Sequence, residues 1–393
     1  MKIAIVVRSY HRQGGIAKGT AEVAERLTER GHEVHIITNS WKDVRNNKVI
    51  FHKVPMIRAS YLEQIKQFGW AKVIKGLSFA ITSRFYCNRN DFDIVQVKGD
   101  SFAHFDIVSA HSCHRAWLEI SKKEGRGTIH WIKKHINPLH IRVLLTEQYN
   151  YNFQNYKKIM AVSEGVKREI VHFYKVPEED IVVIPNGIDL EEFNPNNRDI
   201  YRQEVRARYN ISTDDFIILF VGYEFRRKGL RYIIEALPIV KSEKVKLLVI
   251  GKDNPRPYRE LARRLGVEDR VIFAGHQSRP SLYYAASDAF VFPTSYEAFS
   301  HAIMEAGAAG LPLLVTRVNG ADEVIKDGIN GFFINRESNH IAQRIEILLK
   351  DRVRLNQMGI KAREKAEENS WDRITDMIEK IYEEVAAVKR RKT

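Results

Sequence analysis

Cysteine is almost absent from this sequence of 393 residues, which holds only Cys87 and Cys113. Two thiols without the spacing of metal ligands argue against a disulfide framework and against a zinc cluster. The sequence also lacks any run of about 18 apolar residues, the length that a membrane-spanning helix needs. Residues 1–7 are too short and too soon interrupted to be a signal peptide. We therefore expect a cytoplasmic protein.

Acidic residues are scarce relative to basic ones, with 49 Asp and Glu against 63 Lys and Arg and a net charge of +14. Such an excess calls for an anionic partner, which is a nucleic acid, a phosphorylated acceptor or an acidic membrane surface. Charge alone does not choose among them. Because no helix-turn-helix, zinc-finger or RNA-recognition pattern accompanies the basic residues, we expect no nucleic-acid partner.

The sequence does contain enough apolar residues for two hydrophobic cores, with 44% hydrophobic and 28% charged residues. Two segments each join an apolar strand, a glycine-containing loop and a helix, the opening of a parallel α/β domain. In the first, residues 2–7 precede two glycines and a helix predicted over residues 17–30. In the second, residues 216–221 precede a basic, glycine-bounded loop and a helix predicted over residues 230–240.

Further short apolar runs predict more strands in both halves. They cover residues 33–38, 94–97 and 105–108 in the first half and residues 246–250, 270–274, 289–292 and 312–316 in the second. Pro, Asn and Gly cluster over residues 185–198, which favours a domain boundary there, and a late helix is predicted over residues 371–392. In open α/β sheets, ligands bind at the carboxyl ends of the strands.

Two carboxylates, Glu297 and Glu305, flank the most informative junction in the chain. Residues 284–293 read as a buried strand that ends at a proline, and residues 302–309 have helical composition closed by Gly and Pro. Glu297 is therefore expected in a loop, and Glu305 about two turns into the helix. A solvated helix face is the other interpretation of such a pair.

Three segments in this order resemble the markers of the retaining glycosyltransferases of family 4. They are Pro-Asn-Gly-Ile-Asp at residues 185–189, the basic loop at residues 220–229, and Glu297-x7-Glu305 with the Gly-Leu-Pro that ends at residue 312. The resemblance implies the α/β GT-B fold, in which two Rossmann-like domains face each other across a cleft and a C-terminal helix crosses back to the first domain. Residues 197–203 and 251–256 look most like the subfamily that adds glucose to a heptose of the lipopolysaccharide core.

On this resemblance, residues 1–184 are expected to form an acceptor-binding domain and residues 185–370 a domain that binds the nucleotide sugar. Residues 371–393 are expected to form the helix that packs back on the first domain. The implied activity moves a hexose, glucose, from UDP-glucose to a membrane-associated anionic glycolipid such as lipopolysaccharide core. The enzyme would be peripheral on the inner face of the cell membrane.

The site residues take the following roles in this interpretation. Arg227 and Lys228 stabilise the charge that develops on the leaving diphosphate. Glu297 accepts hydrogen bonds from the sugar hydroxyls and Glu305 from the two ribose hydroxyls. The N–H groups of Phe299 and Ser300, at the helix start, bind the diphosphate. The family commonly has Gly at the position of Ser300, and the amide role survives this change if φ is negative at Ser300.

The first domain is expected to contribute backbone amides and an imidazole. Gly14 and Gly15 bring N–H groups close to a phosphate or acceptor at a helix N-terminus, although a Gly-Gly pair is often just a turn. His111 matches the family's cleft histidine better than His114 does. Asp106 is the fallback if a carboxylate performs that role.

No cofactor or metal is expected, because Arg, Lys and helix-terminal amides take the place of a metal at the diphosphate. Asp91 and Asp93 mimic an Asp-x-Asp metal motif, but they precede a predicted strand and are interpreted as turn residues.

Residues 61–89 interleave basic and apolar side chains, the composition of an amphipathic helix at a membrane surface. An ordinary helix packed on the core has the same composition. For the whole protein two other functions stay open. One is a nucleotide-sugar epimerase with the same fold, and the other is a non-catalytic basic module that binds lipid.

Overall fold

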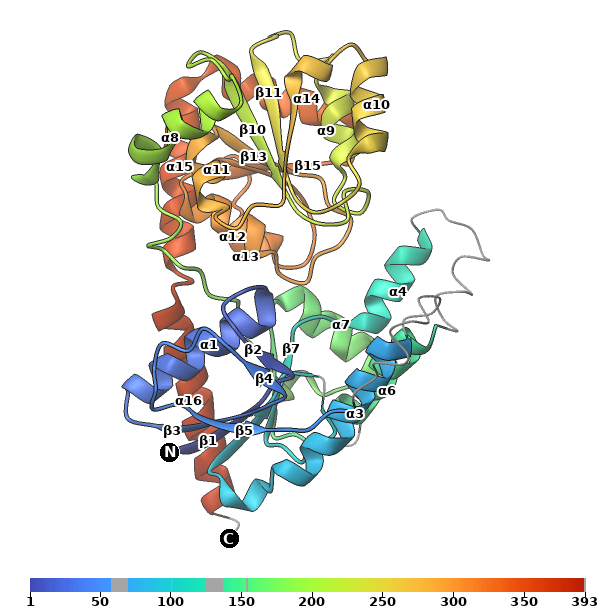
Figure 1. Cartoon of the computed structure of the whole chain (residues 1–393), viewed down its shortest axis with the longest axis vertical. Coiled ribbons are helices and arrows are strands. Elements are labelled where there is room, and N and C mark those ends of the chain that lie inside the picture. Colours follow the sequence, from blue (N-terminus) through green and yellow to red (C-terminus); the bar gives the residue numbers. More distant parts are fainter. Residues whose placement is uncertain (58–69, 100, 124–136, 153–154, 392–393) are drawn as a thin grey trace. The chain divides into compact units, whose positions relative to one another are not determined.

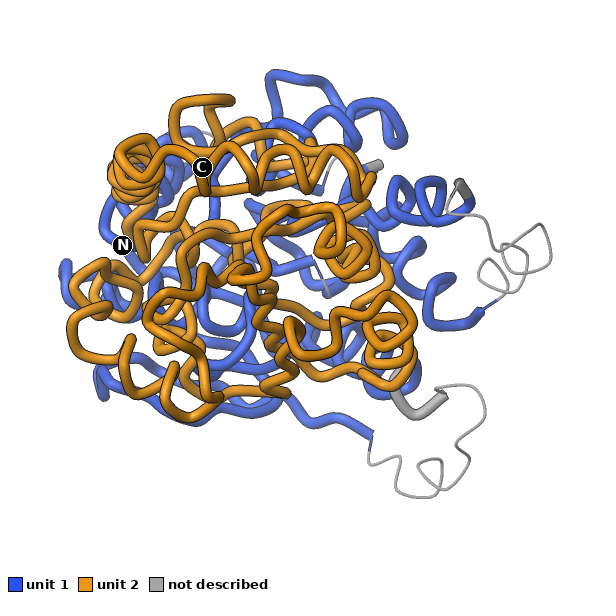
Figure 2. The backbone as a smooth tube through the Cα atoms, turned by 90° about the horizontal axis from the view of Figure 1, so that it is seen from above, with its two compact units in different colours: residues 1–186, 371–393 blue, residues 187–370 orange. Residues whose placement is uncertain are grey.

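A computed structural model describes residues 1–57, 70–99, 101–123, 137–152 and 155–391 (Figure 1). Contacts between Cα atoms divide the chain into unit 1, residues 1–186 and 371–393, and unit 2, residues 187–370 (Figure 2). The division falls within the Pro, Asn and Gly cluster at residues 185–198. Within the described ranges, no helix combines the length and the hydropathy that a bilayer crossing requires.

Unit 1 is built on a seven-stranded parallel sheet with the order β5-β3-β1-β6-β7-β8-β9. The order reverses between β1 and β6, so β1 has β3 on one side and β6 on the other. The main strands are β1 (Lys2–Val6), β3 (Glu33–Thr38), β5 (Ile50–Lys53), β6 (Ile94–Val97), β7 (Ile107–Ala110), β8 (Lys158–Ala161) and β9 (Ile181–Val183). Its helices are α1 (Gly15–Glu29), α3 (Trp70–Tyr86), α4 (His114–Lys123), α6 (Pro138–Asn152), α7 (Glu164–Tyr174) and α16 (Trp371–Arg390).

The last helix, α16, completes the core of unit 1, as the resemblance implies. It packs beside α1 (Figure 1). Trp371 and Ile374 join the apolar cluster formed by β1, β3 and α1. Further along the helix, the Tyr382 hydroxyl donates a hydrogen bond of 2.6 Å to the buried Gln96 on β6. A helix at the end of the sequence therefore stabilises the sheet that begins the sequence.

Unit 2 is a second parallel sheet of six strands in the order β12-β11-β10-β13-β14-β15. The strands are β10 (Phe216–Val221), β11 (Val245–Ile250), β12 (Val271–Gly275), β13 (Ala289–Phe292), β14 (Leu313–Thr316) and β15 (Gly331–Ile334). The helices are α8 (Asn197–Arg208), α9 (Leu230–Ala236), α10 (Arg256–Arg264), α11 (Ser281–Ala286), α12 (His301–Ala308), α13 (Ala321–Val324), α14 (Ser338–Lys350) and α15 (Arg352–Glu367). The central strands are almost wholly buried and apolar, which is typical of parallel strands covered on both faces.

The structure corrects three predicted elements. The strand expected over residues 284–293 is only β13, and Tyr284 lies instead in the helix α11 that Pro280 begins. Short apolar runs do not distinguish a buried strand from a buried helix by periodicity. The helix expected over residues 230–240 ends at Ala236. The strand expected from residue 105 starts at Ile107 and runs to Ala110.

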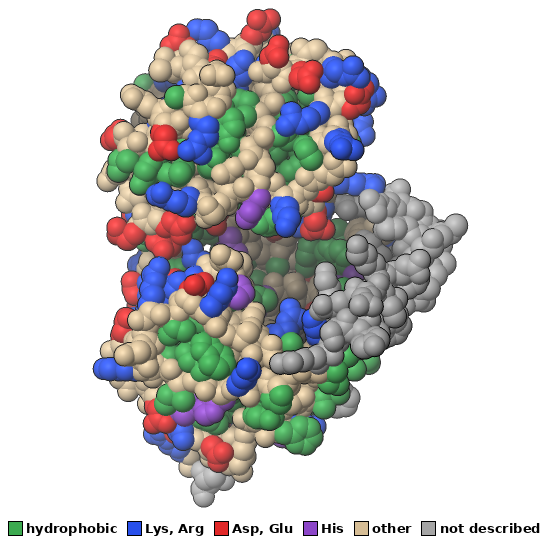
Figure 3. Space-filling view, in the orientation of Figure 1, with side chains coloured by type: hydrophobic (Ala, Val, Ile, Leu, Met, Phe, Trp, Pro, Cys, Tyr) green, Lys and Arg blue, Asp and Glu red, His purple; other side chains and the backbone are tan. Residues whose placement is uncertain are grey.

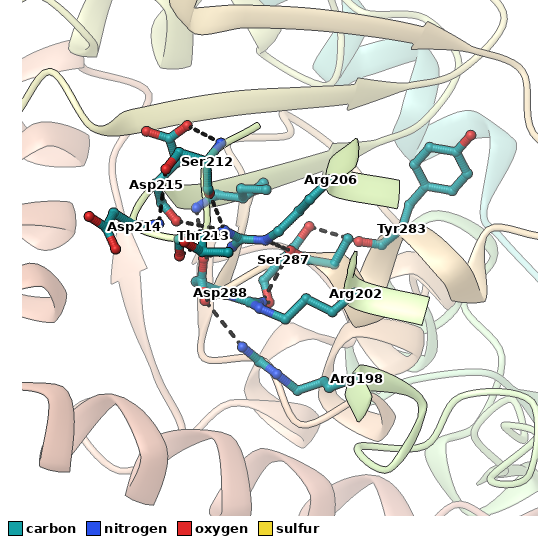
Figure 4. Close-up of polar contacts among 12 residues, drawn as sticks. Arg198, Arg202, Arg206, Ser212, Thr213, Asp214, Asp215, Tyr283, Ser287 and Asp288 are labelled. Atoms are coloured by element: carbon teal, nitrogen blue, oxygen red, sulfur yellow. Dashed lines mark hydrogen bonds and ion pairs between the residues drawn. The ribbon is translucent and has the colours of Figure 1, made fainter. Parts of the chain in front are cut away.

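Residues 197–203, which were interpreted as a subfamily marker, form most of α8. Three arginines of this helix bind one carboxylate (Figure 4). Arg198, Arg202 and Arg206 stand at successive helical turns and reach Asp288 at 3.1, 2.8 and 2.9 Å. Asp288 also accepts a hydrogen bond of 2.8 Å from the amide of Ile217. The cluster therefore clamps α8 onto the amino ends of β10 and β13.

Candidate active site

The predicted site residues of the second half meet at the point where the strand order of unit 2 reverses. β10 pairs with β11 on one side and with β13 on the other. The basic loop follows the carboxyl end of β10, and Glu297 follows the carboxyl end of β13. Such a reversal is where open α/β sheets bind their ligands.

Glycine allows the basic loop to approach the end of β13 closely. Gly229 has a φ of 78°, and a Cβ atom there would lie 2.1 Å from the carbonyl oxygen of Pro293. The carbonyl of Arg227 accepts a hydrogen bond of 3.0 Å from the amide of Ser295. Any side chain at residue 229 would therefore push the two loops apart.

Glu297 holds both predicted cations through one oxygen. Its Oε1 lies 2.7 Å from Lys228 Nζ and 3.1 Å from an Arg227 guanidinium nitrogen. The Thr294 hydroxyl donates to the same oxygen at 2.9 Å. Lys228 also stands over the ring of Phe292 at 4.6 Å from its centroid. Two cations and one anion are thus fixed together before any ligand arrives.

Burial acts on both cations, with different outcomes. The pKa of Lys228 is lowered by desolvation, although Glu297 acts in the opposite direction. Desolvation also disfavours the charged form of Arg227, but the carboxylates of Glu297 and Glu224 outweigh it and raise the pKa of that guanidinium. Lys228 therefore loses its proton at lower pH than an ordinary lysine, and Arg227 keeps the site positive.

The helix α12 begins at the predicted place. Ser300 is its N-cap with φ −86°, so the condition for the amide role at this residue is met. The Phe299 side chain is buried and packs against Gly320, where a Cβ atom would lie 2.8 Å from its ring. The ring of Phe299 is therefore structural, and the backbone amide is what this residue offers to a ligand.

Glu305 lies about one turn into α12, not two, because the helix begins only at His301. Its Oε2 accepts a hydrogen bond of 2.8 Å from the buried hydroxyl of Tyr284. Burial, with the nearby Glu305 carboxylate, raises the pKa of Tyr284 well above its ordinary value, so the hydroxyl stays a donor. Tyr284 was missed as a site residue because its segment was interpreted as a strand.

Three of the predicted residues belong to unit 1. Gly14 has φ 79° and is the N-cap of α1, and Gly15 is the first residue of that helix. His111 directly follows β7 and lines a small cavity of about 40 Å³ together with Lys98 and Trp371. Gly14 and Gly15 therefore lie at the amino end of α1, and His111 lies at the carboxyl end of β7.

The structure rejects Asp106 as the fallback carboxylate and gives His114 a different environment. Asp106 is fully buried at the amino end of β7, where it binds Arg89 at 2.6 Å. The ring of His114, at the start of α4, contacts His140 at 3.0 Å and stacks on Trp117. Asp106 therefore has a structural role. It lies at the amino ends of the strands, opposite the carboxyl ends at which such sheets bind ligands.

The Asp-x-Asp mimic is turn chemistry, as predicted. Asp91 ends a short 3-10 helix, and Asp93 accepts a hydrogen bond of 2.8 Å from the amide of Lys2. Both precede β6. Across the part of the chain that the structure describes, no group of three or more His, Cys, Asp or Glu residues is arranged to hold a metal ion.

Comparison with known proteins gives matches over both halves of the chain. The family model described as Glycosyltransferase Family 4 matches residues 13–192, and the model described as Glycosyl transferases group 1 matches residues 201–365. The N-acetyl-alpha-D-glucosaminyl L-malate synthase of Bacillus anthracis is 29% identical over 98% of this chain and 98% of its own length. The lipopolysaccharide glucosyltransferase WaaG of Escherichia coli K12 is 25% identical over 85% of each chain.

Solved structures agree with the expected fold. The crystal structure of WaaG matches with a TM-score of 0.76 and 22% identity over 97% of this chain and 99% of that one. Anabaena HepE in complex with UDP-glucose matches with a TM-score of 0.71 and 18% identity over 98% and 100%. Both α/β units and their order in the chain are shared with these proteins. The chain belongs to the glycosyltransferases of family 4 and has the GT-B fold.

Proposed function

We propose that this glycosyltransferase moves glucose from UDP-glucose to a membrane-associated anionic glycolipid such as lipopolysaccharide core, with retention and without a metal. The observation that carries the donor half is the cluster of Arg227, Lys228 and Glu297 at the strand reversal of unit 2. Two fixed cations suit a diphosphate, and a fixed carboxylate suits sugar hydroxyls. The choice of glucose and of the lipid acceptor rests on the likeness to WaaG.

The mechanism assigns each group a task in the transition state. When the diphosphate enters, Arg227 and Lys228 bind its oxygens, and Glu297 exchanges its cation contacts for sugar hydroxyls. The amides of Phe299 and Ser300 bind the same diphosphate, and Glu305, oriented by Tyr284, binds the ribose. These donors stabilise the negative charge that grows as the glycosidic bond breaks.

Unit 1 supplies the acceptor side in this proposal. The amides at Gly14 and Gly15 and the imidazole of His111 hydrogen-bond the acceptor or the transferred sugar. The acceptor hydroxyl attacks the face that the diphosphate leaves, and the departing phosphate takes its proton. Retention then needs no covalent intermediate on the protein.

The direct test is a screen of UDP-glucose, UDP-galactose, UDP-N-acetylglucosamine and ADP-glucose, each with and without lipopolysaccharide core acceptors. We expect UDP release to depend on acceptor and to be fastest with UDP-glucose. Activity should persist in EDTA, because side chains and amides already balance the diphosphate. Loss of activity in EDTA that Mg²⁺ restores would refute the metal-free mechanism. Sugar isomerisation without acceptor would favour an epimerase, and no binding of any sugar nucleotide would favour a lipid-binding module.

The two glutamates are expected to separate nucleotide binding from sugar binding. Glu305→Ala should weaken UDP and UDP-glucose alike, by roughly tenfold to a hundredfold, because a charged hydrogen bond contributes about 1.5–3 kcal/mol. Glu297→Ala should weaken UDP-glucose much more than UDP. Isothermal titration calorimetry measures both, with Glu204→Ala as the control because Glu204 is exposed on α8, where it pairs with Arg208. Equal losses for both ligands in both variants would contradict the division of roles.

Within the amphipathic segment at residues 61–89, the described helix α3 buries some apolar side chains and exposes others. Residues 61–69, including Lys66, lie outside the described residues, as does the side chain of Lys72. On α3, Val73 and Phe79 are buried, whereas Leu77, Ile81 and Phe85 are 39%, 47% and 79% exposed. These three recur every fourth residue, so they form one apolar face.

The neighbouring helix α6 also exposes apolar side chains. α6 packs against α3 and exposes 42% of Ile141 and 59% of Leu145. Lys75 and Arg84 accompany the apolar residues on α3. We propose that this face docks reversibly on an anionic membrane, since aromatic and aliphatic side chains flanked by cations are the pattern of interfacial helices.

Vesicle binding tests the docking face. Ile81→Ser combined with Phe85→Ser should reduce binding to vesicles rich in anionic lipid at least fivefold and leave UDP affinity unchanged. Raising salt from 0.1 to 1 M should also weaken binding, because the Debye length falls from about 10 Å to about 3 Å. The matched control is Val353→Ser with Ile360→Ser, two exposed apolar residues on α15 of unit 2. Equal vesicle binding by the two double variants would contradict membrane docking and would support the interpretation of α3 as an ordinary packed helix.

A further inference from the structure

A second cavity lies at the strand reversal of unit 1. It has a volume of about 90 Å³ and opens between the carboxyl ends of β1 and β6 and the first turn of α1. One water molecule occupies about 30 Å³ in the liquid, so the cavity accepts a group of several heavy atoms. Its walls are mostly apolar, and its polar side chains are Arg8, Ser9 and Lys98.

Lys98, which directly follows β6, is a partly buried cation, and no carboxylate balances it within the described residues. Its Nζ makes one polar contact there, with Ser109 Oγ at 3.4 Å, a long distance for a charged donor. Ser109 already receives a hydrogen bond of 2.7 Å from Gln96. Lys98 lines this cavity and also the smaller one beside His111.

Among the described residues, the charged surroundings of Lys98 favour an anion. Its titratable neighbours in the two cavities are Arg8 and His111, and neither carries negative charge. The first turn of α1, which lines the cavity at Ile16 and Ala17, contains no acidic residue. The helix N-terminus adds a positive partial charge at the same point. Desolvation lowers the pKa of Lys98 to about 8, and no carboxylate among the described residues offsets it.

We propose that this cavity binds an anionic group of the acceptor, a phosphate or a carboxylate, and that Lys98 is the cation that selects it. That the anion belongs to an acceptor rests on the proposed function, whereas the anion site itself is argued from the residues of unit 1 alone. Lys98 then determines acceptor specificity, because it pairs with a negative charge on the acceptor. The pairing takes place at the reversal of strand order in unit 1, where such sheets bind ligands. The donor binds to unit 2.

The first test follows Lys98 itself by NMR in protein labelled with [ε-13C]lysine, using inorganic phosphate, acetate and chloride at equal ionic strength. The signal absent from Lys98→Met should titrate near pH 8 in chloride. An anion that binds the protonated lysine tenfold more tightly raises this midpoint by about one unit. We expect that rise with phosphate or with acetate, and whichever anion produces it identifies the class. An unchanged midpoint in all three salts would overturn the proposal.

The same experiment is insensitive to phosphate bound elsewhere, because it reads one side chain of unit 1. Lys48, which is exposed on the same unit, supplies the control resonance, and this resonance should not respond to the choice of anion. The anion-dependent shift of the Lys98 midpoint is expected even if no sugar transfer is found. The experiment can therefore refute the anion site and the proposed function independently.

Kinetics provide the second test where an acceptor is active. Lys98→Met should raise the acceptor KM at least tenfold and leave the donor KM unchanged. Lys98→Arg should restore acceptor binding and extend it to higher pH, because guanidinium keeps its proton where Lys98 loses it. A donor KM that moves with the acceptor KM, or no rescue by Arg, would assign Lys98 a structural role instead.

Discussion

Replacing Lys228 by alanine is expected to lower kcat by a factor of roughly 10²–10³, the usual cost of removing one preorganised donor from a developing anion. The fold should tolerate the change, because Glu297 keeps its contacts with Arg227 and Thr294. Arg227→Ala should have a similar effect on turnover. Steady-state kinetics and thermal unfolding together separate catalytic loss from unfolding.

The control for both variants is Arg226→Ala. Arg226 is exposed in the same loop, and its contact with Arg336 uses only the backbone carbonyl. We expect its turnover to remain within twofold of the parent. Near-normal turnover in Lys228→Ala or Arg227→Ala would show that neither side chain faces the leaving diphosphate.

The site also predicts how activity depends on alkaline pH. Lys228 must be protonated to bind the diphosphate, and burial lowers its pKa. Activity should therefore fall as the pH rises through a value below the ordinary lysine range, and Lys228→Arg should move that fall upward.

The largest expected effect on stability is at Asp288. Removing one partner of a buried ion pair costs about 3–5 kcal/mol, because the remaining charge is left uncompensated. Asp288→Ala leaves three guanidinium groups of α8 facing one another and an amide of β10 without its acceptor. Desolvation already lowers the pKa of Arg198 and Arg206, and the neighbouring arginines lower it further, so their charges depend on this carboxylate.

Urea unfolding of unit 2 measures this effect. The midpoint should fall strongly with an unchanged slope, because the surface exposed on unfolding stays the same. Asp214→Ala is the matched control, since Asp214 is 72% exposed and pairs with an equally exposed Lys244. Exposed pairs contribute about 0–1 kcal/mol. Similar losses in the two variants would show that the arginine cluster does not stabilise α8.

The sequence by itself determined the two α/β halves, the family and the residues that form the cluster we propose as the donor site. Arg227, Lys228 and Glu297 were predictable because each lies a few residues after a strand, in a loop whose glycines or prolines set the turn. Local rules suffice for such residues, since a parallel sheet brings the carboxyl ends of neighbouring strands together whatever the rest of the fold does.

Tertiary structure alone decided the roles that depend on distant partners. Asp106 and His111 lie five residues apart at opposite ends of β7, so only the true start of that strand separates a buried structural carboxylate from an imidazole that lines a cavity. Tyr284 contacts Glu305, Asp288 contacts the arginines of α8, and Lys98 lines a cavity with no carboxylate among its described residues, all through contacts far apart in sequence. The sequence gives the type of each ionisable residue. Its desolvation and the opposite charges near it arise only when the chain folds and packs.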